Sequence, residues 1–264
     1  MRSEMASPNS NHFRDGTRNT GEETMKSHIA KSVLTATLAL AAYYPAQAGS
    51  LQVEPVLVDV TAPGAASTVS LRNEGTTPIS AQIRVFRWSL VDGKEKLEPT
   101  DDVVASPPSI TLTPNGQYVT RIVRVSKQPV TGEESYRLLV DQLPDLSQQK
   151  NGTVNLLMRY SIPVFFGASN KKNPTVAWSY AVKGDKITLT ARNEGERRLR
   201  ISALTVRDAG GKTVSFGAGL AGYALGRSTI SWTVPSRGFS ANGSASIAAQ
   251  SDGGPIQAVA VASR

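Results

Sequence analysis

The side chains that most often carry out chemistry in proteins are scarce in this chain. Its 264 residues include no Cys and only two His, His12 and His28. Both lie in an N-terminal segment that we expect to be removed, so the remaining chain has neither residue type. A Ser–His–Asp triad, a Cys nucleophile and a His general base are therefore excluded, as are zinc, copper and iron sites built from nitrogen and sulfur ligands. We expect a protein that is not an enzyme and needs no metal or cofactor.

Carboxylates are the remaining candidates for catalysis. Asp101 and Asp102 are adjacent, and Asp141 and Asp145 follow later in the chain. The Asp101-Asp102 pair has the surroundings of a loop, and Asp145 follows a proline. The sequence contains no Gly-x-x-x-x-Gly-Lys-Ser/Thr phosphate loop and no Asp-rich calcium loop. A carboxylate-dependent periplasmic hydrolase is therefore the weakest of the functions considered.

Residues 25–48 have the three parts of a secretory signal peptide. Lys26 and Lys31 supply positive charge, 33–42 is a short apolar run, and Ala46-Gln47-Ala48 is a cleavage motif. The apolar run is too short to span a bilayer. We therefore predict a protein that is secreted through a cleaved signal peptide.

The mature chain is predicted to begin at Gly49. Residues 1–24 are polar, and a signal peptide does not need such a prefix. We expect these residues to be a non-native or mis-annotated extension, with the true start at Met25. A genuine long n-region is the alternative.

The charge pattern bears on the kind of partner. The formal net charge is +8 at pH 7, but the basic residues are scattered and aromatic residues make up only 6%. A nucleic-acid partner would need a basic surface with aromatic residues for stacking, so none is expected. No segment after residue 48 is long and apolar enough to span a membrane, so no stable membrane insertion is expected.

Short extended segments separated by Gly, Pro and Asn turn signals fill the rest of the chain. The predicted strands are 51–60, 67–71, 79–88, 109–112, 118–125, 136–143 and 154–166, followed by 176–182, 187–191, 200–207, 213–216, 229–234 and 256–261. This spacing, with no long helical period, predicts an all-β fold of antiparallel sandwiches. Because 167–174 reads as a linker, we predict two immunoglobulin-like β-sandwich domains, 49–167 and 168–264, set at an angle.

One tetrapeptide, Arg-Asn-Glu-Gly, occurs twice, at 72–75 and 192–195. Each copy follows an alternating strand, so both are predicted to be tight turns, with positive φ supplied by Asn or Gly. An internal duplication and two convergent turns are both compatible with the repeat. Either one fits two sandwiches in tandem.

The segment 151–166 is the most informative part of the sequence. Alternate apolar residues share one face of the predicted strand: Val154, Leu156, Met158, Tyr160 and Ile162. Pro163 cannot donate to a ladder, so the strand should end at an edge or a bend. A long apolar edge strand invites pairing with another chain. The alternative is a last strand that is buried in its own sheet.

At this point the sequence resembles the periplasmic pilus (fimbrial) chaperones of the chaperone–usher pathway. The resemblance covers 50–264 and rests on 51–60, the 71–75 turn, Pro107-Pro108, 112–116 followed by Arg121, 136–144, 154–166, and 222–226 through Trp232. It implies a chaperone that lends its edge strand to a pilin subunit lacking its last strand and delivers the subunit to an outer-membrane usher. The five alternate residues above match the donor positions.

The resemblance is incomplete at one point. Well-known members bind the C-terminal carboxylate of the pilin with an Arg and a Lys, and those positions are Pro55 and Pro163 here. This departure resembles the divergent, archaic branch of the family, in which other arginines would replace the pair. The candidates are Arg137 and Arg159, with Arg121 and Arg124 as weaker ones, because a guanidinium binds a carboxylate bidentately. The alternative function is an exported immunoglobulin-like structural or adhesive subunit.

Overall fold

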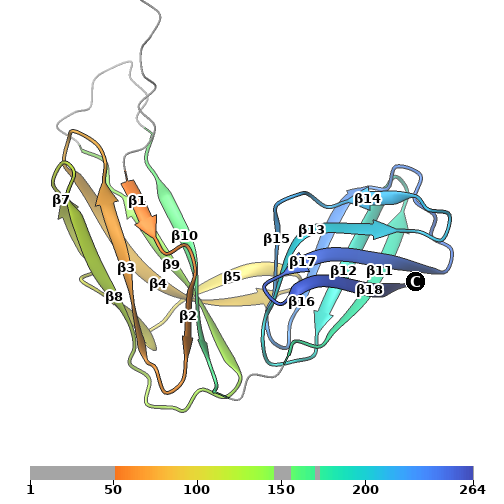
Figure 1. Ribbon diagram of the computed structural model, residues 1–264, viewed down its shortest axis with the longest axis horizontal. Coiled ribbons are helices and arrows are strands. Elements are labelled where there is room, and N and C mark those ends of the chain that lie inside the picture. Colours follow the sequence, from red (N-terminus) through yellow and green to blue (C-terminus); the bar gives the residue numbers. More distant parts are fainter. Residues whose placement is uncertain (1–50, 146–155, 170–172, 264) are drawn as a thin grey trace, which may run out of the picture. The chain divides into compact units, whose positions relative to one another are not determined.

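The computed structural model describes residues 51–145, 156–169 and 173–263 (Figure 1). Within these ranges the chain consists of strands β1–β18 joined by turns, and it contains no helix, so no helix there could cross a membrane. The predicted all-β class is thus confirmed. The predicted extension and signal peptide, residues 1–48, lie outside the described residues, whereas 49–264 forms one compact unit.

The first ten strands form two sheets that share a core (Figure 1). The four-stranded sheet has the order β1 (Leu51–Glu54), β3 (Ala66–Asn73), β8 (Gln117–Arg124) and β6 (Val103–Ser106). The six-stranded sheet has the order β2 (Val58–Thr61), β10 (Arg159–Gly167), β9 (Glu133–Gln142), β4 (Ile79–Val91) and β5 (Lys94–Pro99), with β7 (Ser109–Leu112) also paired to β4.

Alternation along these strands gives the six-stranded sheet two distinct faces. On the inner face, Ile83, Leu138 and Ile162 are buried in the core that this sheet shares with the four-stranded sheet. The register then places Arg84 and Phe86 of β4 on the outer face. Each large aliphatic side chain buried in this way contributes about 1.5–3 kcal/mol to stability. The outer face carries the candidate site described below.

The predicted first strand, 51–60, is wrong in one respect. It is two strands in different sheets, because β1 pairs with β3 while β2 runs parallel to β10. The break falls at Pro55, which has no backbone N–H to donate to a ladder. Strands β5 and β6 were not predicted. The first of them, Lys-Glu-Lys-Leu-Glu-Pro, is exposed throughout and lacks apolar alternation.

The remaining strands form one eight-stranded sheet around a second core. Its order is β14 (Thr213–Ser215), β13 (Leu199–Arg207), β17 (Ser244–Ser251), β18 (Gly254–Ala262), β11 (Val176–Lys183), β12 (Lys186–Asn193) and β16 (Thr229–Pro235), with β15 (Leu220–Ala224) paired to β13. Trp178 and Ile187 from one part of the sheet share a core with Val206 and Ile247 from the other, so the sheet curls over on itself. Strands β15 and β17 were not predicted, since Gly, Ala and Ser dominate them.

The repeated Arg-Asn-Glu-Gly turns are built alike. Asn73 and Asn193 are fully buried, and each side-chain amide donates to main-chain carbonyls, such as Thr77 O at 2.8 Å and Arg197 O at 2.7 Å. Each Asn Oδ1 accepts from the N–H of the turn glycine two residues on. The tight turns are confirmed, but the predicted positive φ is absent from both. Gly195 is required by close approach instead, because a Cβ there would lie 3.0 Å from Thr175 N.

Candidate protein-binding site

Half of strand β10 is an open edge. β9 pairs with β10 from Arg159 to Gly167, but on the other side β2 pairs only with Val164–Gly167. Among the described strands, none pairs with the Arg159–Pro163 half on that side. An unpaired edge presents main-chain donors and acceptors to any extended segment that approaches it.

The five predicted donor residues differ in how far they are buried in this chain. Ile162 is 2% exposed in the core of this chain, and the half-buried Tyr160 packs against that core and donates its hydroxyl to Leu51 O. Met158 is half-buried, whereas Leu156 is 87% exposed. Val154 lies outside the described residues. One apolar face therefore begins inside the core and continues past it to the surface.

The described strand begins at Arg159, later than the predicted residue 154. Residues 156–158 are not in a strand because their neighbour β9 ends at Gln142, whose N–H donates to Met158 O at 2.9 Å. Beyond that bond the segment has no partner strand within the described residues. The predicted apolar alternation is thus only partly in a strand: Tyr160 and Ile162 lie in β10, whereas Leu156 and Met158 precede it.

An ion-pair cluster lies on the outer face beside this edge. Asp141 of β9 accepts hydrogen bonds from Arg159 Nε and from Arg84 Nη2, the latter at 2.7 Å. Burial alone would raise the pKa of the Asp141 carboxyl, but the hydrogen bonds from Arg84 and Arg159 outweigh burial and hold that pKa below its usual range. The Arg159 side chain remains 63% exposed, so much of it is open to solvent and accessible to a ligand.

Arg137 lies on the same outer face, directly across the ladder from Pro163. Its guanidinium carbon stacks 3.7 Å from the centre of the Trp88 ring, and its Nη2 donates to Glu95 Oε1 at 2.6 Å. Its Nε is buried and has no acceptor in the described part of the chain. The side chain is 12% exposed. Arg137 is thus held at the surface by an aromatic ring and a single carboxylate.

Arg124 and Arg121 differ from the first two candidates. Arg124 uses Nε and Nη2 on Glu134, at 2.8 and 2.9 Å, and its other donors on Ser126 O and Gln128 O. Its side chain is 7% exposed, so it has little capacity for a further ligand. Arg121 is exposed, but both arginines belong to β8 in the four-stranded sheet. The structure brings Arg137 and Arg159 to one face and leaves the other two away from it.

Sequence reasoning missed the residues that join the two sandwiches. Arg198, 5% exposed, donates to Glu133 and, at 2.7 Å, to Asp59, and it stacks 3.7 Å from the centre of the Phe165 ring. Burial raises the pKa of Glu133, and the attraction of Arg198 does not fully offset it. Phe165 also clusters with Trp88, Tyr223 and Leu225. These residues are far apart in the sequence, so no local motif predicts that they come together.

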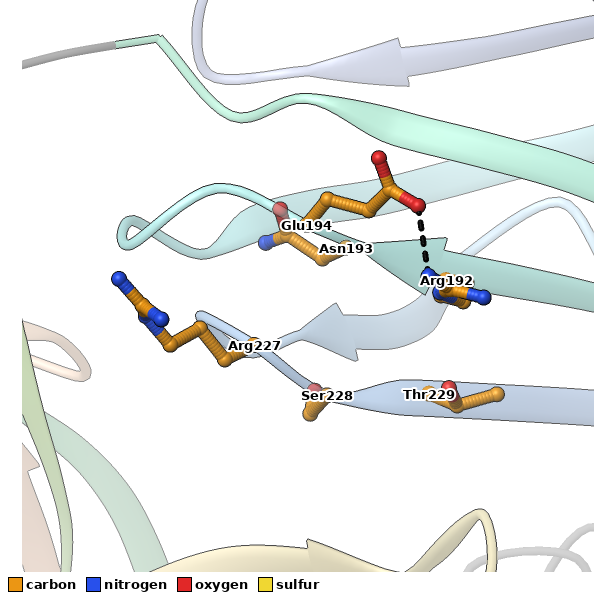
Figure 2. Close-up of a pocket in the computed structure, with 6 residues that line it drawn as sticks. All are labelled: Arg192, Asn193, Glu194, Arg227, Ser228 and Thr229. Atoms are coloured by element: carbon orange, nitrogen blue, oxygen red, sulfur yellow. Dashed lines mark ion pairs between the residues drawn. The ribbon is translucent and has the colours of Figure 1, made fainter.

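A pocket of about 410 Å³ in the second sandwich is a poorer candidate (Figure 2). It is lined by Arg192, Asn193, Glu194, Arg227, Ser228 and Thr229. Arg192 pairs with Glu194 at 2.9 Å and Arg227 with Glu196 at 2.7 Å, and both arginine side chains are at least two-thirds exposed. The paired charges and the open, solvated position give a ligand little to gain.

Comparisons with known proteins bear on the first sandwich most directly. Residues 50–170 match the family of pili and flagellar-assembly chaperones, PapD N-terminal domain. Among curated proteins, none matches the sequence significantly.

Solved structures with the same fold cover most of the chain. A chain of the CsuC–CsuE chaperone–tip adhesion subunit pre-assembly complex, from the archaic chaperone–usher Csu pili of Acinetobacter baumannii, has 24% identity and a TM-score of 0.64; the match covers 82% of this chain and 100% of that one. A chain of the complex of the Salmonella enterica SafA pilin with the SafB chaperone has 20% identity and a TM-score of 0.56; the match covers 81% of this chain and 97% of that one. The E. coli chaperone DraB has 21% identity and a TM-score of 0.54; the match covers 80% of this chain and 98% of that one.

These likenesses confirm the predicted immunoglobulin-like fold, and the family match confirms the resemblance noted in the sequence. Residues 50–170 match the PapD N-terminal domain of pili and flagellar-assembly chaperones, within a chain that has the fold of the chaperone–usher chaperones.

Proposed function

We propose that this chain is a periplasmic chaperone that captures pilin subunits by donor-strand complementation and hands them to an outer-membrane usher. The observation that carries the proposal is the open edge of β10, which is preceded by residues 156–158, where the apolar series that is buried at Ile162 reaches the surface. A sandwich that lacks one strand exposes a groove of main-chain groups and core side chains. An added strand satisfies both, since it extends the ladder and fills the groove with alternate residues.

The donor residues that we propose are Val154, Leu156 and Met158. Tyr160 and Ile162, also predicted, are already engaged with the core of this chain, and in this proposal they fix the register of the donor segment. Because a slip of one residue would turn the opposite face to the subunit, a strand anchored at its buried end presents its free end in one register.

The proposed anchor for the subunit's terminal carboxylate is Arg137, with Arg159 as the second cation. Pro163 occupies the position where a Lys is expected from the family resemblance, and Arg137 is its direct neighbour across the ladder. A cation on the next strand can therefore reach the same region of the outer face. The absence of the usual pair at Pro55 and Pro163 also supports placing the chain in the archaic branch.

The proposal includes export. Residues 25–48 would act as the signal peptide, and the working chaperone would consist of 49–264, with domains 49–167 and 168–264. N-terminal sequencing of the periplasmic protein tests this part. We expect the sequence to begin at Gly49, and a periplasmic protein that still begins at Met1 or Met25 would contradict it.

Co-purification tests the function itself. A tagged copy of the full chain, expressed in its own host, is isolated from the periplasm and its partners are identified by mass spectrometry. We expect one small β-rich subunit in a one-to-one complex. If the tagged chain instead formed polymers of itself, it would be a structural subunit, and the chaperone proposal would be wrong.

A further inference from the structure

Arg137 already holds a carboxylate in the structure. Its Nη2 donates to Glu95 Oε1 at 2.6 Å. Glu95 comes from β5, the edge strand of the six-stranded sheet, and its side chain is 52% exposed. The proposed anchor is therefore occupied before any subunit arrives, and a ligand must either displace Glu95 or share the guanidinium with it.

Glu95 is the weakly held member of the carboxylates that pair with the candidate arginines. The Asp141 side chain is 10% exposed and accepts from both Arg84 and Arg159. Glu134 is 18% exposed and accepts two bonds from Arg124. Glu95 accepts one bond from an arginine and is half in solvent, so water can replace that bond at small cost.

The guanidinium itself is held in place independently of Glu95. Arg137 stacks 3.7 Å from the centre of the Trp88 ring. Trp88 is 3% exposed and contacts Phe165 and Tyr223, with ring centroids 5.8 and 5.6 Å away. When Glu95 leaves, Arg137 keeps this platform and need not be reordered for the next ligand. A preorganised cation loses less entropy on binding.

Arg137 also has an unused donor. Nε is buried and has no acceptor in the part of the chain that the structure describes. Because Nε is buried while Glu95 is in place, a carboxylate from outside can reach it only where the displacement of Glu95 uncovers it. A C-terminal carboxylate that accepts from both Nε and Nη2 would then form two charge-assisted bonds where Glu95 forms one, and would be the better ligand for this arginine.

We propose that Glu95 is an internal stand-in ligand, which the C-terminal carboxylate of a subunit replaces on Arg137. The inference rests on the proposed function and adds a specificity element to it. Competition from Glu95 raises the threshold for occupying Arg137, so weak anions are excluded. A terminal carboxylate whose strand also pairs with β10 exceeds that threshold.

The test compares two subunits and three variants in the mature full chain. The probes are the co-purified subunit with its own C-terminus, and the same subunit with two glycines added, which moves the terminal carboxylate out of position. The variants are Glu95→Gln, the matched control Glu98→Gln on the same strand, and Arg137→Ala. Glu98 pairs with Lys96 at 2.9 Å and not with Arg137. Thermal melts establish that each variant is folded.

Removing a half-exposed competing carboxylate should tighten binding of the native subunit about fivefold. We expect Glu95→Gln to show that gain with the native C-terminus and none with the extended one, and Glu98→Gln to match the wild type. Equal affinities of Glu95→Gln and wild type, beside a weakened Arg137→Ala, would overturn the stand-in role and leave the anchor intact. Full binding by Arg137→Ala would overturn the anchor itself.

Discussion

At the residue scale, Arg137 and Arg124 have different neighbours, and this is why we propose only Arg137 as an anchor. Arg124 donates to Glu134 and to two main-chain carbonyls, so its hydrogen bonds lie within the first sandwich. Arg137 leaves one donor unused and stacks on Trp88 beside an exposed carboxylate. The sequence marked both as candidate anchors, and only the contacts separate them.

Replacing Arg137 with alanine should weaken subunit capture without unfolding the protein. A charged hydrogen bond of this kind contributes about 1.5–3 kcal/mol, which is about 10- to 150-fold in affinity. Binding of the co-purified subunit by surface plasmon resonance measures the loss, with Arg121→Ala as the control on the other sheet. Equal losses for the two variants would contradict the assignment.

Asp141 should make stability depend on acid pH. Its pKa is lowered in the folded protein because the arginine hydrogen bonds outweigh burial. The stabilisation is therefore present above the unfolded pKa of about 3.9 and is lost as pH falls through the lower folded pKa. We expect the difference in unfolding free energy between wild type and Asp141→Asn to shrink below about pH 4. Urea melts from neutral to acid pH measure it, and a constant difference would contradict the coupling.

At the scale of elements, apolar alternation predicted most strands, including β7 with its bounds and β3, β4, β9 and β12 within a few residues. The alternation failed to predict strands where pairing with a neighbouring strand, and not the sequence of the strand itself, decides the structure. Pro55 splits one predicted strand between two sheets, and charged β5 is a strand only because β4 pairs with it. β17 escaped prediction because its core face, including Ala245 and Ala249, is built largely from small residues. The sequence could not predict that residues 156–158 lack a partner strand, since pairing there depends on where β9 and β2 end.

The free end of the donor segment gives an element-scale prediction. Changing Leu156 and Met158 to Asp should abolish subunit capture, because each unpaired charge buried in the groove costs far more than the lost contact contributes. Leu157, next in sequence and 46% exposed, is the matched control, since the alternation of a donor strand would turn it to the other face. Capture is measured by native gel shift after a thermal melt of each variant. Loss with Leu157→Asp and retention with the pair would mean that the opposite face is the donor.

At the scale of the whole molecule, a few buried residues join the two sandwiches. Arg198 follows β12 yet contacts Asp59, Glu133 and Phe165, which belong to three strands of the first sandwich. The Phe165 ring also meets Trp88, on which Arg137 stacks. The proposed anchor is therefore built on a cluster to which both sandwiches contribute. The sequence predicts the two sandwiches and their order, but not these contacts.

Removing the central arginine should destabilise the protein strongly. Arg198→Met removes the hydrogen bonds to the buried Glu133 carboxylate and leaves it only Arg197, whose Nε lies 3.9 Å from Glu133 Oε2, at a cost of about 3 kcal/mol. Adding Glu133→Gln removes that charge and should recover part of the loss. Urea unfolding of Arg198→Met, Glu133→Gln and the double variant measures the effect. A double variant that is destabilised by the sum of the two single changes would show that the pair is not coupled.

Site-specific cross-linking tests the central claim, capture through the open edge of β10 and the segment 156–158 before it, most directly. A photoreactive side chain is placed in the full chain at position 156, 157 or 121, and the periplasm is irradiated. The account predicts a strong adduct with one small β-rich subunit from position 156, a weaker one from 157, and none from 121 on the four-stranded sheet. An adduct from 121 with none from 156 would contradict the claim that this edge receives the subunit.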